Sequence, residues 1–172
     1  DRNANRAGWK MAKDVRECHA KSIGDYVGIP IPTYPDQTGI RISDYVDGTI
    51  KEGKIYPTGR NQYGYSFGYG TPFDNKLPVT DELGEFFGYY ISEGNAFHNG
   101  IIVSNTNRKR LRRMRELADR LFGIKTNEYV KGQIQLNSTI LRRLFIALFG
   151  EGALNKRIPQ IAMGFPHSAK VA

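Results

Sequence analysis

A carboxylate at the end of a small-residue stripe is the first feature of this sequence that could carry out chemistry. Gly84, Gly88 and Ser92 recur every four residues, so they share one face of a helix, and Glu93 follows directly. Small residues at this spacing let two helix backbones approach closely. A carboxylate at the negative end of a helix is unfavourable unless a cation compensates it. The pattern predicts two paired helices whose terminal acids meet around a divalent metal; an exposed glutamate at a frayed helix end is the alternative interpretation.

Basic side chains are concentrated in the second half of the 172-residue chain. Residues 81–172 hold 14 basic and 8 acidic side chains, whereas residues 1–80 hold 11 and 9. Most of the excess lies in one stretch, which contains Arg108, Lys109, Arg110, Arg112, Arg113, Arg115, Arg120 and Lys125. A basic stripe of this kind is typical of a protein that binds a polyanion such as nucleic acid. A solvated helix face would give the same pattern.

Composition excludes several classes of protein. The chain is 40% hydrophobic and 24% charged, which is typical of a globular domain and excludes a wholly disordered one. No stretch reaches the roughly 18 apolar residues of a membrane helix. Cys18 stands alone, so a disulfide framework and a cysteine-rich zinc site are excluded, and the three histidines show no metal-ligand spacing. We therefore expect a basic, cytoplasmic protein without a membrane segment.

The elements that would position these residues follow a break near residue 76. Thr80 can cap the first helix, and Gly94-Asn95 can end it. Apolar periodicity and turn residues then predict strands over 96–98 and 101–104, a helix over 107–122, strands over 126–131 and 133–137, and a helix over 139–149. Asn99-Gly100 predicts a two-residue hairpin turn. This order indicates an α+β fold, in which an antiparallel sheet has its helices on one face.

The first 76 residues are rich in Gly, Pro and Tyr. Tyr63, Tyr65, Phe67 and Tyr69 alternate with small residues, which predicts a strand with one aromatic face. These rings could pack against a neighbouring element or stack on bases. We expect residues 33–76 to form a β-rich linker or a DNA-contacting region, and residues 76–80 to form a linker and a helix start.

Residues 83–94, LGEFFGYYISEG, resemble the signature helix of the LAGLIDADG (dodecapeptide) homing endonucleases, in the form carried by archaeal inteins. In that family two such helices pack together, and the acid before the final glycine binds the catalytic metals. The resemblance places Glu93, with Gly94 beside it, at this metal site. The family's half-domain has the order αββαββα, so residues 77–172 are identified as a first half-domain. Residues 155–159, NKRIP, resemble the family's Lys-x-Ile-Pro block and place Lys156 near the cleavage site.

The N-terminal third is similar to a different part of an intein. Residues 9–15 and 24–30 resemble the stretch of a splicing (Hint) domain that leads into its endonuclease insert, so residues 1–32 are expected to belong to that domain. Splicing needs a Cys or Ser at the intein's first residue, an upstream block with Thr and His, and a C-terminal His-Asn. These residues are not present in this sequence, so splicing chemistry is not expected of it.

Residues 165–172 look like the approach to a second signature helix. We expect the chain to be a fragment of a longer reading frame in which a second half-domain supplies the second acid. The alternative is a one-motif protein that pairs with a second copy of itself.

The resemblance implies a site-specific double-strand DNA endonuclease that uses Mg²⁺ or Mn²⁺. Glu93 would bind metal, Lys156 would stabilise charge or polarise water, and Gly84, Gly88 and Ser92 would face the partner helix. The strands would read bases in the major groove through Asn95, His98, Asn99, Glu128, Lys131, Gln133 and Gln135. Phosphates would be contacted by Arg108, Lys109, Arg112 and Arg113.

Two other functions stay open. A duplex-DNA-binding module of the same fold without catalysis would typically have lost the acid. A basic RNA-associated domain unrelated to the family would use the aromatic residues at 63–69.

Overall fold

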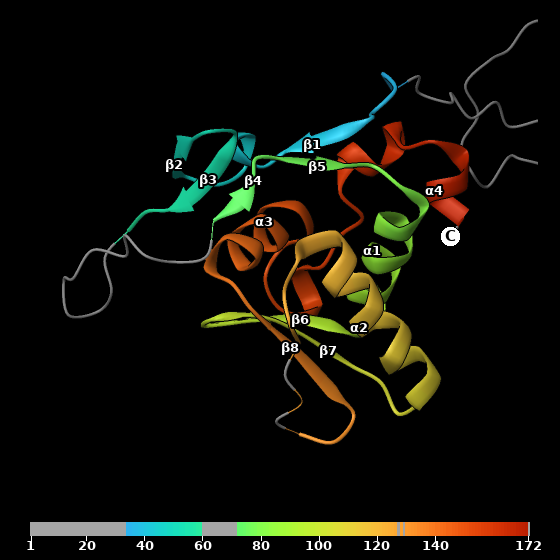
Figure 1. Ribbon diagram of the computed structural model, residues 1–172. Helices are drawn as coiled ribbons and strands as arrows, with labels where there is room; N and C mark the ends of the chain where they lie inside the picture. The colour runs from blue at the N-terminus through green and yellow to red at the C-terminus, as the bar shows by residue number, and fades with distance from the viewer. Residues whose placement is uncertain (1–33, 60–71, 127, 129, 172) are drawn as a thin grey trace, which may run out of the picture. The chain divides into compact units, whose positions relative to one another are not determined.

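Three helices begin at polar capping residues and cover one face of a sheet (Figure 1). The computed structural model describes residues 34–59, 72–126, 128 and 130–171. The helices are α1 (Asp81–Glu93), α2 (Arg108–Phe122) and α3 (Thr139–Phe149). The side chains of Thr80, Asn107 and Ser138 accept hydrogen bonds from first-turn N–H groups, which would otherwise be unpaired.

The sheet beneath these helices has three antiparallel strands in the order β6 (Gly94–Phe97), β7 (Gly100–Ser104), β8 (Gln133–Asn137). Its helix-facing positions are wholly buried; they include Ile101, Val103, Ile134 and Leu136. Intervening residues point to the opposite face because side chains alternate along a strand. The predicted α+β arrangement, with helices on one face of an antiparallel sheet, is confirmed.

The predicted strand over residues 126–131 is wrong for the described residues of that stretch. Thr126 and Glu128 have no regular structure, and a turn closed by the Gln133 N–H and the Val130 carbonyl (3.0 Å) leads directly into β8. Gly132 takes a positive φ of 84° in this turn. Strand β8 pairs along one edge with β7, and no described residue of 126–131 pairs with its other edge. The described element order is therefore αββαβα.

Two predicted boundaries also shift. His98-Asn99, not Asn99-Gly100, forms the hairpin turn, and Gly100 pairs with Phe97 within the sheet. A Cβ at Gly100 would overlap the Leu136 carbonyl, which explains the glycine by close strand contact. Gly94 ends α1 in an extended conformation (φ −88°) instead of the left-handed one expected of a terminating glycine.

Residues 34–59 and 72–80, which precede α1, belong to the same compact unit as this half-domain. Strand β1 (Gly39–Arg41) pairs with β5 (Lys76–Pro78). A short 3-10 turn, Ile42–Asp44, comes directly after β1. A second sheet consists of β2 (Gly48–Lys51), β3 (Lys54–Pro57) and β4 (Phe73–Asp74). The predicted linker over 76–80 is therefore a strand in its first half. The predicted domain boundary at residue 77 lies inside one compact unit, Tyr34–Ala172.

An aromatic cluster holds α1 against α3. Phe87 and Tyr90 of α1 make edge-to-face contacts with Phe145 at centroid distances of 5.7 and 4.6 Å, and Phe149 completes the cluster. Tyr90, Phe145 and Phe149 are at most 1% exposed. Aromatic pairs of this kind add about 0.5–1.5 kcal/mol each beyond the area they bury. The end of α1 that carries Glu93 is thus fixed by packing.

The C-terminal stretch returns to α1. It contains two 3-10 turns, Ala153–Asn155 and Gln160–Gly164, and a short helix α4 (His167–Val171) that packs on α1. Within the described ranges, no helix has the length and apolar character needed to cross a membrane. The splicing-domain segment expected over 1–32 and the aromatic run at 63–69 lie outside the described residues.

Candidate functional site

Glu93 is the last residue of α1 and is exposed at the point where the helix meets strand β6. The N–H of Gly94 donates to the carbonyl of Tyr90, which closes the final turn. A Cβ at position 94 would overlap the Tyr90 ring. Glycine is therefore required here by close packing under the chain, and this packing fixes the backbone that carries the carboxylate.

Lys156 reaches the same end of α1 from the loop after α3. Its Nζ donates to the carbonyl oxygens of Tyr90 and Ile91, both at 3.0 Å, and lies 5.4 Å from the centre of the Tyr90 ring. The Tyr90 carbonyl also accepts the Gly94 N–H, whereas the Ile91 carbonyl lies in the last turn, where carbonyls lack intrahelical partners. Both carbonyls lie at the negative end of the helix dipole. Lys156 is thus the cation that compensates this helix end.

Electrostatics link this lysine to the candidate acid. Burial lowers the pKa of Lys156, and the nearby negative charge of Glu93 acts in the opposite direction. Burial raises the pKa of the Tyr90 hydroxyl to about 12; Glu151 adds to the rise and Arg142 opposes it. Lys156 is therefore bonded to the end of α1 that carries Glu93, and the roles of both residues at a cleavage site stay predictions.

The small-residue stripe of α1 is covered at one end. A Cβ at Gly84 would overlap the carbonyl oxygen of Ala169 in α4, so the glycine permits a close contact between the two helices. Gly88 is exposed, with open space where its Cβ would lie. The Ser92 hydroxyl donates to carbonyls of its own helix, those of Gly88 (3.1 Å) and Tyr89 (3.2 Å). At Gly84, the first position of the stripe, the helix that packs closely on α1 is therefore α4 of the same chain.

A complete metal site is not formed by the described residues. No three Asp, Glu, His or Cys side chains within those ranges gather closely enough to hold an ion. Glu93 offers a single carboxylate. Mg²⁺ is commonly held by one or two carboxylates while it keeps several waters, so Glu93 fits as one ligand of a shared site.

Three of the predicted base-reading residues share the sheet face turned away from the helices. Asn95 and Gln135 both pair with Ile102, and Gln133 pairs with Ser104. His98 and Asn99 lie exposed at the β6–β7 turn, and Lys131 is exposed in the turn before β8. Sequence reasoning missed Ile102, Ser104 and Asn137 on this face; alternation from Gln133 could have predicted Asn137.

The Glu128 side chain, a predicted base-reading residue, makes contacts within its own chain. Its carboxylate pairs with the Arg115 guanidinium and accepts the Gly132 N–H at 3.3 Å. The hydrogen bond from Arg115 is the largest cause that lowers the pKa of Glu128. This side chain orders the turn before β8.

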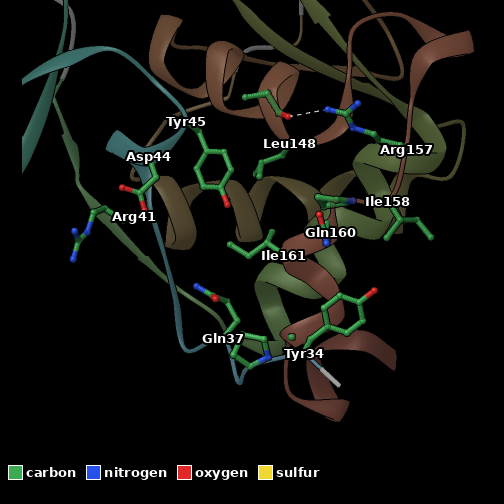
Figure 2. A pocket seen from close by; sticks show the side chains of 14 residues that line it. Tyr34, Gln37, Arg41, Asp44, Tyr45, Leu148, Arg157, Ile158, Gln160 and Ile161 are labelled. Atoms are coloured by element: carbon green, nitrogen blue, oxygen red, sulfur yellow. Dashed lines mark hydrogen bonds between the residues drawn. The ribbon is translucent and has the colours of Figure 1, made fainter. Parts of the chain in front are cut away.

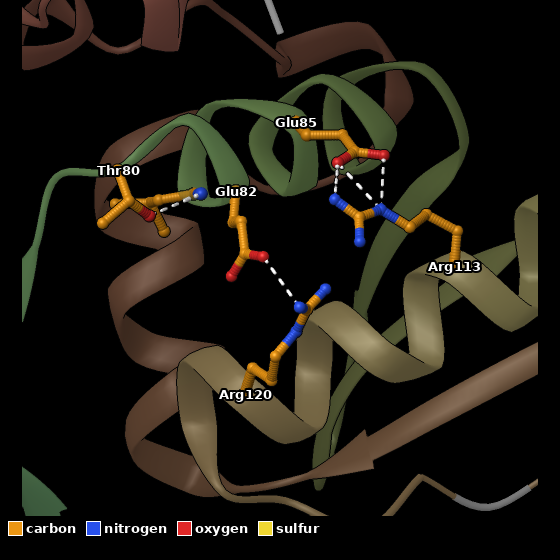
Figure 3. A network of polar contacts seen from close by, with 6 residues as sticks. Thr80, Glu82, Glu85, Arg113 and Arg120 are labelled. Carbon is orange, nitrogen blue, oxygen red and sulfur yellow. Dashed lines mark hydrogen bonds and ion pairs between the residues drawn. The ribbon is translucent and has the colours of Figure 1, made fainter.

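The predicted phosphate-binding residues on α2 fall into two groups. Arg108, Lys109 and Arg112 are exposed. Arg113 instead donates to both carboxylate oxygens of Glu85 on α1, at 2.6 to 3.1 Å (Figure 3). Arg113 therefore joins two helices, a role the sequence did not reveal because 28 residues separate the partners.

A second ion pair lies farther along the same two helices. Arg120 of α2 lies 3.0 Å from Glu82 of α1 (Figure 3). Both side chains are partly exposed, so we expect this pair to contribute at most about 1 kcal/mol. It belongs to the helix–helix contact.

A separate feature is an open groove of about 750 Å³ (Figure 2). Residues of the segment around Tyr45 and of the stretch 147–164 line the groove. Its charged groups belong to Arg41, Asp44 and Arg157. The backbone N–H of Arg157 is bonded to the Phe149 carbonyl at 2.9 Å. None of the predicted site residues lines the groove, so it is separate from the chemistry assigned to Glu93.

Comparison with known proteins matches a family over part of the chain. Residues 81–148 match a family described as "LAGLIDADG-like domain". This range runs from the first residue of α1 to the last turn of α3, so it includes Glu93 and the three-strand sheet. No curated protein matches the chain. The match supports the LAGLIDADG homing endonuclease family, whose domains occur in nucleases and related DNA-binding modules.

Proposed function

We propose that this chain is part of a metal-dependent, site-specific double-strand DNA endonuclease encoded within an intein. One observation carries the proposal: Lys156 holds the last turn of the small-residue helix at the point where Glu93 emerges. A carboxylate and a lysine fixed together at the rim of a helix-backed sheet provide a metal ligand and a positive charge in one place. The family match over residues 81–148 adds support.

The residues divide the work of phosphodiester hydrolysis between them. Glu93 would hold Mg²⁺ or Mn²⁺ together with the backbone at Gly94, and the bound metal would supply charge stabilisation and an activated water. The Lys156 ammonium has three N–H donors and uses two on helix carbonyls. The remaining donor can stabilise negative charge that develops on the phosphate oxygens. Exposed Arg108, Lys109 and Arg112 would fix the register of the duplex through its phosphates.

The second acid would come from a second half-domain. Helix α4 already packs against Gly84, at the start of the stripe that a partner helix would cover. A second copy of the chain that paired through Gly84 would have to displace α4, whereas a partner helix that began with α4 would keep this contact. We therefore favour a partner helix in the same polypeptide over a homodimer, with Gly88 and Ser92 left to face it.

The proposed catalysis is tested by a matched pair of glutamate substitutions. The test uses a protein in which this chain is joined to a second half-domain; duplexes that it retains are first isolated from a randomised pool and then incubated with Mg²⁺. We expect Glu93→Gln to abolish cleavage while binding persists, because the amide is a poor metal ligand but keeps the side chain's size. Glu116→Gln, which changes an exposed glutamate of α2, should cut as the unaltered chain does. Equal cleavage by both variants would remove Glu93 from the active site.

The second candidate is a duplex-DNA-binding module without catalysis. This alternative is favoured by the composition of the candidate site. Glu93 is the one carboxylate proposed there, and the described residues form no metal-binding cluster. It predicts tight binding to selected duplexes and no Mg²⁺-dependent cutting by the unaltered chain. Addition of a second half-domain would restore cutting under the endonuclease proposal and would have no effect under this one.

A further inference from the structure

We propose that the outer face of the β6–β7–β8 sheet reads a block of A·T base pairs. The inference rests on the proposed binding of duplex DNA and names the sequence class that the protein would prefer. The outer face is defined here as Asn95, Phe97, Gly100, Ile102, Ser104, Gln133, Gln135 and Asn137.

Strand register places the polar residues of this face in one patch. Asn95, Ile102 and Gln135 form a single row across the three strands, because Asn95 pairs with Ile102 and Ile102 pairs with Gln135. Ser104 and Gln133 form the next row. The side chains on the other face, Ile101, Val103, Ile134 and Leu136, are fully buried under the helices. The register therefore fixes which side chains a duplex lying on the sheet would meet.

The chemistry of the patch is selective. The outer face offers four amide side chains, one hydroxyl and one aliphatic group in its central row, and none of its eight positions carries a formal charge. Asn and Gln donate to and accept from the N7 and N6 edge of adenine, whereas guanine is commonly read by Arg or Lys and cytosine by Asp or Glu. An aliphatic side chain such as Ile102 contacts the thymine methyl group. These side chains match A·T pairs.

The positive charges that attract the phosphates lie outside this face. Arg108, Lys109 and Arg112 are on α2, and Lys131 is in the turn before β8. Phosphate contacts give affinity without sequence information, whereas base-edge contacts give specificity. Successive outward residues of β8 are about 7 Å apart, which matches about two base-pair steps, so Gln133, Gln135 and Asn137 span about four or five pairs.

Selection from a pool of duplex oligonucleotides with a randomised centre tests the inference. The 172-residue chain is used in EDTA, so that metal-dependent cutting does not remove the best ligands. We expect a consensus containing an A·T block, in which replacing one pair by G·C weakens binding about 5- to 150-fold. A G·C-rich consensus, or retention without base preference, would overturn the inference while duplex binding stands. Failure to retain any duplex would overturn the proposed function as well.

A pair of glutamine substitutions locates the preference on the sheet. Gln135→Arg should change one position of the consensus from A·T to G·C, because Arg is the usual partner of guanine. Gln160→Arg adds the same charge in the groove of Figure 2 and should leave the consensus unchanged. Circular dichroism confirms folding, and Gln133→Arg replaces the first variant if Gln135→Arg does not fold. An unchanged consensus in the folded sheet variant would contradict the assignment.

Discussion

At the scale of single residues, the junction between α1 and β6 combines groups that are individually unfavourable. Glu93 adds negative charge to the negative end of a helix, and Lys156 is partly buried. Each offsets the other's disadvantage, since the ammonium bonds the terminal carbonyls and lies within electrostatic reach of the carboxylate. Lys156 therefore has a structural role that can be separated from its proposed role at the phosphate.

Lys156→Met keeps most of the side-chain volume and removes the two hydrogen bonds to α1. We expect the free energy of unfolding to fall by about 1–2 kcal/mol, because hydrogen bonds from a charged donor are lost at a partly buried site. Urea denaturation measures the change. Lys109→Met, at an exposed position of α2, is the control and should change stability by less than about 0.5 kcal/mol. Equal effects of the two variants would contradict the capping role.

Tyr90 makes stability depend on pH in the alkaline range. An unfolded tyrosine ionises near pH 10, whereas the folded Tyr90 has a pKa of about 12. The folded protein therefore holds more protons between these values, so its stability falls as pH rises from about 10 to 12, by about 2–3 kcal/mol from this group. Tyr90→Phe should remove that part of the decline, as measured by urea midpoints at several pH values. Tyr34→Phe, at an exposed position, should retain the full decline.

At the scale of elements, α1 makes contacts with the rest of the chain on three sides. Its apolar face, with Leu83, Phe86, Phe87 and Tyr90, is buried in the core. Its small-residue stripe is covered by α4 at Gly84 and open at Gly88. Ion pairs between α1 and α2 form the third set of contacts (Figure 3). The helix that ends in Glu93 is thus positioned from several sides before any partner binds.

Gly84 and Gly88 provide a matched test of the stripe. Gly84→Ala should destabilise the protein by about 1–3 kcal/mol, because the added methyl group overlaps the Ala169 carbonyl and forces α4 away. Gly88→Ala should stabilise it by up to about 1 kcal/mol, since alanine is the better helix former and the space is open. Thermal and urea unfolding measure both. Stabilisation by both variants would show that α4 does not pack closely on α1.

At the scale of the whole molecule, several basic side chains of α2 take part in ion pairs within the chain. Arg113, Arg115 and Arg120 of α2 each have an acidic partner among the described residues. Arg108, Lys109 and Arg112 are exposed toward the start of the same helix. The basic side chains of α2 that stay available to a polyanion are therefore fewer than the sequence suggests, and Arg108, Lys109 and Arg112 among them lie toward the start of the helix.

This distribution predicts the salt dependence of DNA binding. Each neutralised phosphate contributes about −0.9 to the slope of log affinity against log salt concentration. Arg112→Gln should therefore reduce the steepness by about 0.9, whereas Arg113→Gln should reduce it by less because Glu85 already neutralises that guanidinium. Fluorescence anisotropy with a selected duplex gives both slopes. A flat response in the unaltered chain would show that the basic stripe is a solvated face.

Local patterns along the chain were enough to predict the main elements and to identify the candidate acid. Periodic apolar residues and the capping side chains of Thr80, Asn107 and Ser138 are local signals, so the three main helices and the antiparallel sheet were predictable. Glu93 was predictable because its position after a small-residue stripe is also a local pattern.

The features that could not be predicted depend on contacts between distant segments of the chain. The strand expected over 126–131 is replaced, in its described residues, by irregular structure and a turn that contacts with the Glu128 carboxylate and the Val130 carbonyl hold in place before β8. Arg113 is paired to Glu85, Gly84 packs on α4, and Lys156 caps α1, through contacts that join segments 28 to 85 residues apart. Sequence periodicity describes one element at a time, whereas these pairings arise when packing of the core brings separate elements together.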